Sequence, residues 1–466
     1  MSHINISDQI NRQYRTYALY VLQSRGIPNF YDGLTPVQRL ILENSPSRFN
    51  KTIGLVGEVI KTGLYHHGDS SLAGAISKLA RPFGCSYGVL EGDGFFGSPV
   101  NPSPSAPRYT SVRINQRIKD IISKNSDLNT KNEEGGHDWI HVEFPVGLLT
   151  HVVGIAVGYR SNILPRKMED VLEYLQGSPK LLKPYFRDFS GKITRWMNEE
   201  SSWLIESGFE VDKNKKLIRI FDLPPVMRYD SFINKLDDKL DRMGHDYRIE
   251  NRSQSKCDLI VSFRGMSPEI FEETVSTVSK LTKIIVKEDV IFVKDGNVMD
   301  FPSVKDYLDH FKAHLELVRL RRIIKDEEDF SRELAFLEAK LKFLNFMIAK
   351  KRNNNEIVDF VSQFENWISL RLQKIEIVKL SVEHIKQTEE DIKEIKKRIA
   401  QLKKDIKEQE KNYKQVCKNL EKISKTKQTK ISNGLFEESQ INGIEIFQVE
   451  EEDEGKIEEI EQEDEI

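Results

Sequence analysis

The sequence predicts a multidomain α+β protein that ends in a long antiparallel coiled coil. Two short apolar segments, Gly54–Leu64 and Ser70–Leu79, flank a turn that contains glycine, which is the pattern of a helix-turn-helix. β-rich runs mix with helical ones between residues 135 and 300, as in an α+β domain. Beyond Val304, apolar residues recur at steps of three and four, the spacing of a coiled-coil seam.

The N-terminal part is predicted to be helical and to end in a loop. Ile10, Tyr14, Tyr17 and Val21 recur at helical spacing, which predicts a helix over residues 7–22. A further helix is expected at residues 37–42, before the two apolar segments, which also fit a generic helical hairpin. Residues 84–109 are rich in Gly, Pro and Ser and predict a loop, a kind of segment that often carries chemistry.

The middle of the chain is predicted to contain several strands among its helices. The β-rich runs are Trp139–Phe144, Val152–Val157, Lys216–Phe221, Leu259–Phe263 and Ile284–Val293. Their mixture with helical segments predicts an α+β domain rather than a sheet-only fold.

Two seams of apolar residues predict the coiled coil. The outgoing seam comprises Phe330, Leu334, Leu337, Leu341, Leu344 and Ile348. The returning seam comprises Ile385, Ile392, Ile395, Ile399, Leu402 and Ile406. Asn353–Asn355 interrupt the pattern, and Ile357–Leu380 is a compact apolar stretch. We therefore expect a long arm, a small helical knob at about residues 350–380 and a returning arm; an ordinary helical bundle is the alternative.

Charge is distributed unevenly along the chain. Residues 436–466 contain 14 acidic residues and one Lys, whereas residues 1–435 contain 69 basic and 59 acidic residues, a net charge of +10. A basic body favours a polyanionic partner, and residues 426–466 are predicted to form a disordered acidic tail. Three widely spaced cysteines suit a reducing cytoplasm, and we expect no membrane span and no signal peptide.

The dipeptide Arg108-Tyr109, at the end of the loop, is a candidate nucleophile with its activator. A tyrosine hydroxyl is protonated at neutral pH and is a weak nucleophile until its anion is stabilised. An adjacent guanidinium can stabilise that anion and can hold a phosphate oxygen through paired hydrogen bonds. The plainer interpretation is a solvated arginine beside a tyrosine that packs against the loop.

A set of short stretches occurs in an order and at separations that are specific when taken together. They are Tyr17–Pro28 (YALYVLQSRGIP), Asp32–Arg39 (DGLTPVQR), Tyr65–Leu72 (YHHGDSSL), Asp93–Gly97 (DGFFG), Arg108–Thr110, Gly154–Gly158 (GIAVG), Asn162–Pro165 and Leu370–Lys374. With these stretches the chain resembles the cleavage-reunion (A-type) subunit of type IIA DNA topoisomerases, from about Tyr14 to about Leu402. Within that family the motifs most resemble the medium subunits of T-even-type phage topoisomerases.

The resemblance implies a catalytic role for four residues. Tyr109 matches the tyrosine that attacks the phosphodiester and stays linked to a 5′-phosphate, and Arg108 matches the arginine that steadies the five-coordinate phosphate. Arg39 and His67 match a second arginine and a histidine that line the same pocket. Several cations around one phosphorus offset the charge that develops during attack. His67 either stabilises that charge or carries a proton; the sequence leaves both roles open.

The resemblance also implies contacts with DNA. Lys51 and Arg25 match residues that hold phosphates, and His66 is expected to do no more than pack or touch the backbone. Ile155 matches an isoleucine that wedges between base pairs and bends the duplex; the alternative is a buried strand residue.

A drug site is implied on the helix that follows His67. Bacterial relatives carry there a serine and, four residues later, an acid that together hold a water-bridged metal and a quinolone. Ser70 matches the serine, but Gly74 stands in place of the acid. Residues four apart share one helix face, so the serine and the acid would together hold the water-bridged metal. With Gly74 in place of the acid, one of these two side chains is missing. We therefore expect a weak quinolone response.

Two departures from the family's larger members concern cofactors and activity. The sequence shows no phosphate-binding Gly-x-x-x-x-Gly-Lys motif and no Asp-x-Asp-x-Asp triad, so no metal site is expected on this chain. The resemblance therefore implies that Mg²⁺ and ATP are bound by a partner ATPase subunit. It also implies double-stranded DNA as substrate, a homodimer through the C-terminal gate, and action in the cytoplasm, which for a phage protein is the host's. The DNA-wrapping domain of supercoiling relatives is not expected, which favours relaxation and decatenation over active supercoiling.

The resulting division of the chain has four parts: a winged-helix domain over residues 1–120, an α+β tower over 121–300, the coiled coil with its dimerising knob over 301–425, and the acidic tail over 426–466. Two other classes of protein remain open. A tyrosine recombinase also uses Arg, His and Tyr but leaves the tyrosine on a 3′-phosphate. A DNA-binding architectural protein on a coiled-coil rod would form no covalent link with DNA.

Overall fold

The computed structural model describes residues 26–349, 354–375, 382–426 and 430–431, together with Ile10, Gln13, Tyr14, Tyr17 and Val21. These five single residues are helical. The remainder of the helix expected over residues 7–22, Arg25, and residues 432–466 of the predicted tail lie outside the described residues. Within the described ranges, every helix is too short or too polar to cross a membrane.

Among the described residues from Gly26 onward, four α-helices and a small sheet form the N-terminal part of the molecule. Its helices are α2 (Pro36–Asn44), α3 (Thr52–Lys61), α4 (Asp69–Ala80) and α5 (Gln116–Ser123). Its antiparallel sheet has the order β1-β3-β2, with β1 at Asn50–Lys51, β3 at Ser111–Ile114 and β2 at Leu90–Asp93. α2, α3 and α4 contact one another, so the two segments predicted as a helix-turn-helix belong to a three-helix unit with a sheet.

The middle of the chain contains small antiparallel sheets. β4 (Val152–Ala156) and β5 (Tyr159–Ile163) form a hairpin, which α6 (Met168–Leu175) follows. A second sheet has the order β12-β7-β6, with strands Lys283–Lys287, Ser202–Glu206 and Lys192–Arg195. A third has the order β10-β11-β9-β8, with strands Tyr247–Asn251, Asp258–Phe263, Leu217–Phe221 and Gly208–Asp212. The mixed α+β class is confirmed.

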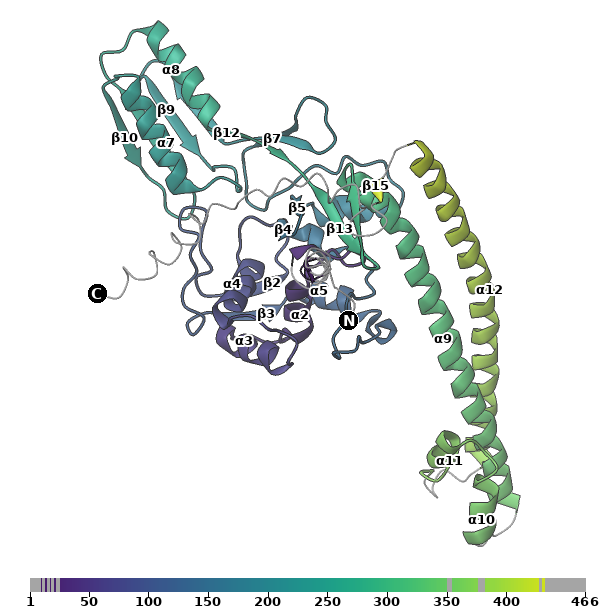
Figure 1. Cartoon of the computed structure of the whole chain (residues 1–466). Coiled ribbons are helices and arrows are strands. Elements are labelled where there is room, and N and C mark those ends of the chain that lie inside the picture. Colours follow the sequence, from purple (N-terminus) through teal and green to yellow (C-terminus); the bar gives the residue numbers. More distant parts are fainter. Residues whose placement is uncertain are drawn as a thin grey trace, which may run out of the picture.

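The third sheet and two helices form a unit with a core of its own (Figure 1). α7 (Tyr229–Arg242) buries Phe232, Leu236 and Leu240 at helical spacing, and α8 (Pro268–Leu281) buries Phe271 and Val278. Leu259, Val261 and Phe263 alternate along β11 and supply the sheet side of that core.

Two of the predicted β-rich runs are corrected by the structure. Trp139–Phe144 forms no strand, although its apolar residues Ile140, Val142 and Phe144 alternate in the sequence; all three are buried, and so is His141 between them. The backbone amides here bond to side chains rather than to a ladder: Ile140 donates to Asp32 Oδ2 (3.2 Å) and His141 to Asn129 Oδ1 (2.8 Å). The run Ile284–Val293 is divided between β12 and β13 (Val290–Lys294), which belong to different sheets.

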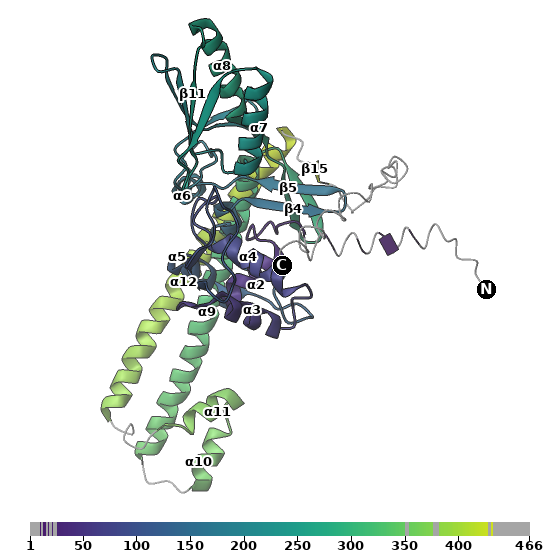
Figure 2. The same cartoon turned by 90° about the vertical axis from the view of Figure 1, so that its left-hand side faces the viewer.

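Two long helices project from the globular part (Figures 1 and 2). α9 spans Val304–Ala349, and its 46 residues correspond to about 69 Å. α12 (Val382–Thr426) returns beside it, and α10 (Asn354–Val361) and α11 (Asn366–Leu372) lie at the far end. Leu337, Leu344, Ile399 and Leu402 of the predicted seams are buried. The long pair therefore replaces the alternative of an ordinary bundle.

The chain returns to the base of the arm after α12. β15 (Lys430–Ile431) pairs antiparallel with β14 (Asn297–Phe301), which itself pairs with β13 (Val290–Lys294), and β14 leads directly into α9. This corrects the prediction that no regular structure occurs from residue 426 onward. The strand forms because β14 offers an edge with free backbone hydrogen-bonding groups to the returning chain.

Candidate active site

Tyr109 lies on the surface at the end of a turn that precedes β3. Its side chain is 69% exposed, as is expected of a group that has to reach another molecule rather than pack the fold. The Arg108 guanidinium lies 5.9 Å from the centre of the Tyr109 ring. The structure therefore excludes the plainer interpretation of Tyr109 as a residue that packs its loop.

Backbone hydrogen bonds hold this turn against the start of α3. The amide of Thr52 donates to the Thr110 carbonyl (3.0 Å), and the amide of Ile53 donates to the Pro107 carbonyl (3.3 Å). The hydroxyls of Thr52 and Thr110 are 2.8 Å apart and buried. Lys51, which is exposed, pairs with Ser111 in the sheet. Arg108, Tyr109 and Lys51 thus belong to one bonded unit, in which the backbone beneath the tyrosine is fixed.

Arg39 occupies the opposite environment, because it is 3% exposed and bound to a buried carboxylate. Its Nε donates to Asp32 Oδ2 (2.7 Å), and its Nη2 donates to Asp32 Oδ1 (3.1 Å) and to the Leu34 carbonyl (3.1 Å). Asp32 also accepts the amides of Leu34 (2.9 Å) and Ile140 (3.2 Å). The charge of Arg39 is therefore compensated inside the fold, and its geometry is that of a positioning residue.

A pocket of about 530 Å³ brings Arg39 together with His66 and His67. Its other walls include residues 132–139 and the tip of the β13–β14 hairpin, at Asp295 and Gly296. His67 packs edge-on to Tyr65 with 5.4 Å between ring centres. Tyr109 and Arg108 do not belong to this lining. Within one chain the predicted catalytic residues therefore form two groups, the tyrosine turn and the histidine pocket.

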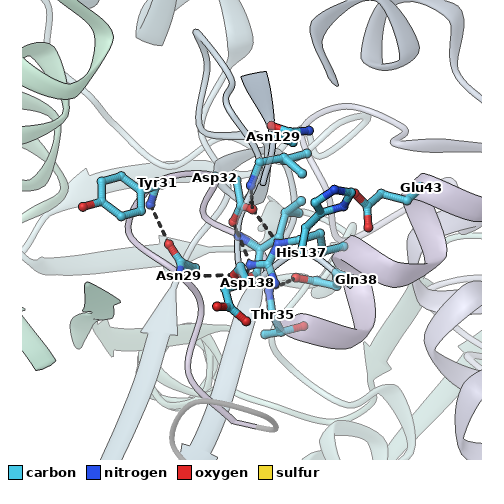
Figure 3. Close-up of polar contacts among 12 residues, drawn as sticks. Asn29, Tyr31, Asp32, Thr35, Gln38, Glu43, Asn129, His137 and Asp138 are labelled. Atoms are coloured by element: carbon cyan, nitrogen blue, oxygen red, sulfur yellow. Dashed lines mark hydrogen bonds and ion pairs between the residues drawn. The ribbon is translucent and has the colours of Figure 1, made fainter. Parts of the chain in front are cut away.

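The pocket contains polar contacts that sequence reasoning missed (Figure 3). His137 Nδ1 and Glu43 Oε1 are hydrogen-bonded at 2.7 Å, which joins α2 to the loop over residues 132–138. Burial raises the pKa of Glu43 above its usual value, and the neighbouring His137 works against that shift. Asn132 Nδ2 donates to Asp138 Oδ1 (2.9 Å), which holds the same loop. No local motif marks the Glu43–His137 pair, because the two residues are 94 positions apart in the chain.

Ser70 stands in the first turn of α4 and is exposed. The helix is capped by Gly68, and Asp69 is its first residue, with the Ser70 amide donating to Asp69 Oδ1 (2.9 Å). Gly74 lies one turn further along, and no atom lies within 4 Å of the position that a Cβ would take there. A side chain at residue 74 is therefore sterically possible.

Ile155 is 72% exposed on β4, so it is not the buried strand residue of the alternative interpretation. Its backbone is fixed by a close approach to Gly26: a Cβ on Gly26 would lie 2.3 Å from the Ile155 carbonyl oxygen. Glycine at residue 26 is required for this contact. An exposed apolar side chain on a fixed strand has the geometry of a wedge.

A divalent metal does not fit the part of the chain that the structure describes. No group of three or more His, Cys, Asp or Glu side chains there is arranged to hold one. Two of the carboxylates that line the pocket are engaged with other side chains, Glu43 with His137 and Asp295 with the hydroxyl of Tyr31 (2.9 and 2.8 Å).

Comparison with known proteins identifies the family. The family model for the A-type subunit of DNA gyrase and topoisomerase IV matches residues 25–421. The chain is 24% identical to the DNA topoisomerase medium subunit of Enterobacteria phage T4, over 79% of this chain and 88% of that subunit. It is 35% identical to the DNA gyrase A-type subunit of Borreliella burgdorferi, over 37% of this chain and 23% of that protein.

A third relative, the DNA gyrase A-type subunit of Buchnera aphidicola subsp. Acyrthosiphon pisum, is 25% identical over 81% of this chain and 49% of its own length. The matched part thus spans about half or less of these gyrase subunits and most of the phage subunit. The family match covers most of the chain, and on that ground the chain belongs to the family of A-type subunits of DNA gyrase and topoisomerase IV, which are type IIA DNA topoisomerases.

Proposed function

We propose that this chain is the DNA-breaking and rejoining subunit of a type IIA topoisomerase, with Tyr109 as its nucleophile. The observation that carries the proposal is the exposed tyrosine on a turn bonded to α3, with Arg108 beside it. The three-helix unit α2–α4 with the sheet β1-β3-β2 is proposed to be the winged-helix module that presents this turn to DNA.

The proposed reaction is a transesterification. Tyr109 Oη attacks the phosphorus, a bond from Oη to phosphorus forms, and the bond from phosphorus to the 3′-oxygen breaks. The tyrosine loses its proton and the departing 3′-oxygen gains one. The reverse attack by the 3′-oxygen restores the DNA, so the link itself retains the energy needed for religation.

Cationic side chains lower the barrier of this step. Arg108, next to the nucleophile, is proposed to hold the phosphate oxygens as negative charge develops on them. Lys51 is proposed to hold a neighbouring phosphate, which positions the duplex without reacting. Arg25 and His66 are proposed backbone contacts, Ser70 a contact on α4, and Ile155 the wedge that bends the duplex.

The pocket residues are proposed to act through position. Arg39, bound to Asp32, has a fixed position in the lining of the pocket that contains His67. His67 is proposed either to stabilise developing charge or to carry the proton that moves from Tyr109 to the 3′-oxygen.

Mg²⁺ and ATP are used by this family, and we propose that a partner ATPase subunit binds both. The described residues of this chain offer no metal cage. Magnesium supplies charge neutralisation at the cleaved phosphate when it is bound.

The distal knob is proposed to join two copies of the chain. Val358 of α10 and Trp367 and Leu370 of α11 are exposed apolar residues at the far end of the arm. A surface of this kind is stabilised when a second copy covers it. Two copies are required by the proposed reaction, because each tyrosine cuts one strand and the second duplex passes through the resulting double-strand break.

We further propose that the assembled enzyme relaxes and decatenates DNA rather than actively supercoiling it. The acidic segment 436–466 repels phosphate and is unsuited to guide DNA around the protein. We place this activity in the cytoplasm, and in the host cytoplasm if the chain is a phage protein. With ATP and a relaxed plasmid, we expect no accumulation of negative supercoils in a topoisomer assay; their accumulation would refute this part of the proposal.

The function as a whole is tested by adding denaturant to the chain and a DNA duplex, with and without the partner ATPase subunit, so that any covalent protein–DNA complex is trapped. We expect protein-linked DNA when both subunits and Mg²⁺ are present, with the protein on the 5′ end, and little or none with this chain alone. A link to the 3′ end would favour a tyrosine recombinase mechanism. Complete absence of a covalent product with both subunits present would favour a noncatalytic architectural role.

A further inference from the structure

Seven exposed lysines lie along one face of α12. They follow one another at intervals of four, seven, three, four, three and four residues, which keeps them on one side of an α-helix. The lysine face, as we call it, comprises Lys393, Lys397, Lys404, Lys407, Lys411, Lys414 and Lys418. Ile392, Ile399 and Leu402, which are buried in the seam with α9, fall on the other side of the helix.

The lysine face carries a row of positive charges, with Glu408 and Glu410 of the same helix beside it. Neighbouring Lys396 and Lys403 reach across to α9 and pair with Glu338 (2.7 Å) and Glu327 (3.7 Å). Within the described ranges, none of the seven lysines of the face takes part in an ion pair of this kind. Like charges at helical spacing repel one another over the roughly 38 Å that the face spans. Such a face is stabilised by a polyanion.

The chain itself continues into a polyanionic segment after this helix. α12 ends at Thr426, and β15 then pairs Lys430 with Asp300 and Ile431 with Met299, which anchors the chain at the base of the arm. The residues after β15 include the segment 436–466 with its 14 acidic residues and one lysine. Eighteen residues lie between Ile431 and Glu450, where the densest acidic run begins, and this connection can extend to about 60 Å.

We propose that the acidic segment 436–466 docks in cis along the lysine face of α12. Charge complementarity favours it, and its attachment through β15 gives it an effective concentration of about 1 mM at the helix. DNA, the polyanion of the proposed reaction, has no such tether to this arm. The docking does not depend on the cleavage chemistry, because it requires neither DNA nor a partner subunit.

The test is carbodiimide cross-linking of the full-length chain, which joins lysine amines to carboxylates in direct contact. We expect links between residues 450–465 and residues 404–418, formed within one polypeptide when labelled and unlabelled chains are mixed. The variant Lys407→Glu/Lys411→Glu should lower the yield of these links about fivefold, as loss of two ion pairs does. The control Lys235→Glu/Lys239→Glu changes two exposed lysines with the same spacing on α7 and should leave the yield unchanged.

A second set of variants exchanges the charges of the lysine face and the acidic segment, which distinguishes loss of docking from a perturbed helix. Adding Glu451→Lys/Glu452→Lys to Lys407→Glu/Lys411→Glu should restore the links, now with amine and carboxylate exchanged. Equal yields in wild type and Lys407→Glu/Lys411→Glu, links formed only between different polypeptides, or protection of the lysine face by a DNA duplex but not by the segment would each overturn the proposal.

Discussion

Tyr109 and Arg39 are both expected at the site of chemistry, yet the fold treats them in opposite ways. Tyr109 is 69% exposed, and only the backbone beneath it is bonded, through Thr52 and Thr110. Arg39 is 3% exposed, and its guanidinium is itself bonded to Asp32. A nucleophile has to meet a substrate that comes from outside, whereas a buried, compensated cation shapes what surrounds it. Substitution of Tyr109 should therefore affect activity and not stability, whereas loss of the Arg39–Asp32 pair should affect stability.

The largest expected effect is on cleavage in Tyr109→Phe. Removal of the hydroxyl removes the only atom that attacks, so covalent cleavage should fall below detection in the presence of the partner subunit. DNA affinity should stay within about twofold of wild type, and the free energy of unfolding should change by less than about 0.5 kcal/mol, as for other surface substitutions. Filter binding and denaturant unfolding measure these two controls. Cleavage retained by Tyr109→Phe would remove Tyr109 from the mechanism.

The variant Asp32→Asn is expected to lose stability. It leaves the Arg39 charge buried without its partner, which should cost about 3–5 kcal/mol of stability. The measurement is the first unfolding transition in denaturant. The matched control is Glu91→Gln, which breaks the exposed pair with Arg113 (2.6 Å) and should cost about 1 kcal/mol or less. Equal losses in the two variants would mean that the Asp32–Arg39 pair does not hold the pocket.

Arg108→Ala and Lys51→Ala should divide the tyrosine turn into a reacting and a positioning part. Arg108→Ala should slow cleavage at saturating DNA by about 100-fold or more, because it removes charge stabilisation at the reacting phosphate. Lys51→Ala should leave that rate unchanged. It should lower the slope of the logarithm of the DNA-binding constant against the logarithm of the salt concentration by about one, the value of one phosphate contact. Rate measurements at saturating DNA and binding titrations over a range of salt distinguish them. The same pattern in both variants would contradict the division.

The smallest expected effect concerns the quinolone response. Wild type should respond weakly, because Ser70 lacks an acid one turn further along α4. Gly74→Asp has free space for its side chain and should sharpen the response about fivefold, the value of one added hydrogen-bonded bridge. Gly57→Asp, at another glycine with free space, is the control in a cleavage-complex titration. No change in Gly74→Asp, or a wild-type response as strong as that of bacterial enzymes, would show that this account of the drug site is wrong.

How far the sequence predicts this molecule depends on how local the determining contacts are. The seams of α9 and α12 are predictable because apolar residues recur at helical spacing within each segment, as with Leu337 and Leu344. The prediction for Trp139–Phe144 is wrong because apolar residues that alternate in the sequence occur both in a strand and in an irregular segment bonded to distant side chains such as Asp32. The division of Ile284–Val293 between two sheets depends likewise on pairing partners far away in the chain.

The candidate site shows the same limit. The motif that contains Tyr109 identifies an exposed residue, and glycine at residue 26 agrees with the close approach to Ile155. The burial of Arg39 is not predictable, because an arginine in DGLTPVQR looks the same whether or not Asp32 of that motif folds back onto it. The pair Glu43–His137 escapes prediction for a related reason, since it joins residues 94 positions apart.

The most direct test of the central claim is to identify the residue that becomes linked to DNA. Cleavage complexes formed with Mg²⁺ and the partner subunit are trapped in denaturant, the DNA is trimmed with nuclease, and the remaining adduct is located by peptide mass spectrometry. We predict a phosphodiester link between Tyr109 and the 5′ end of the cut strand. A link at any other residue, or to the 3′ end, would contradict the account.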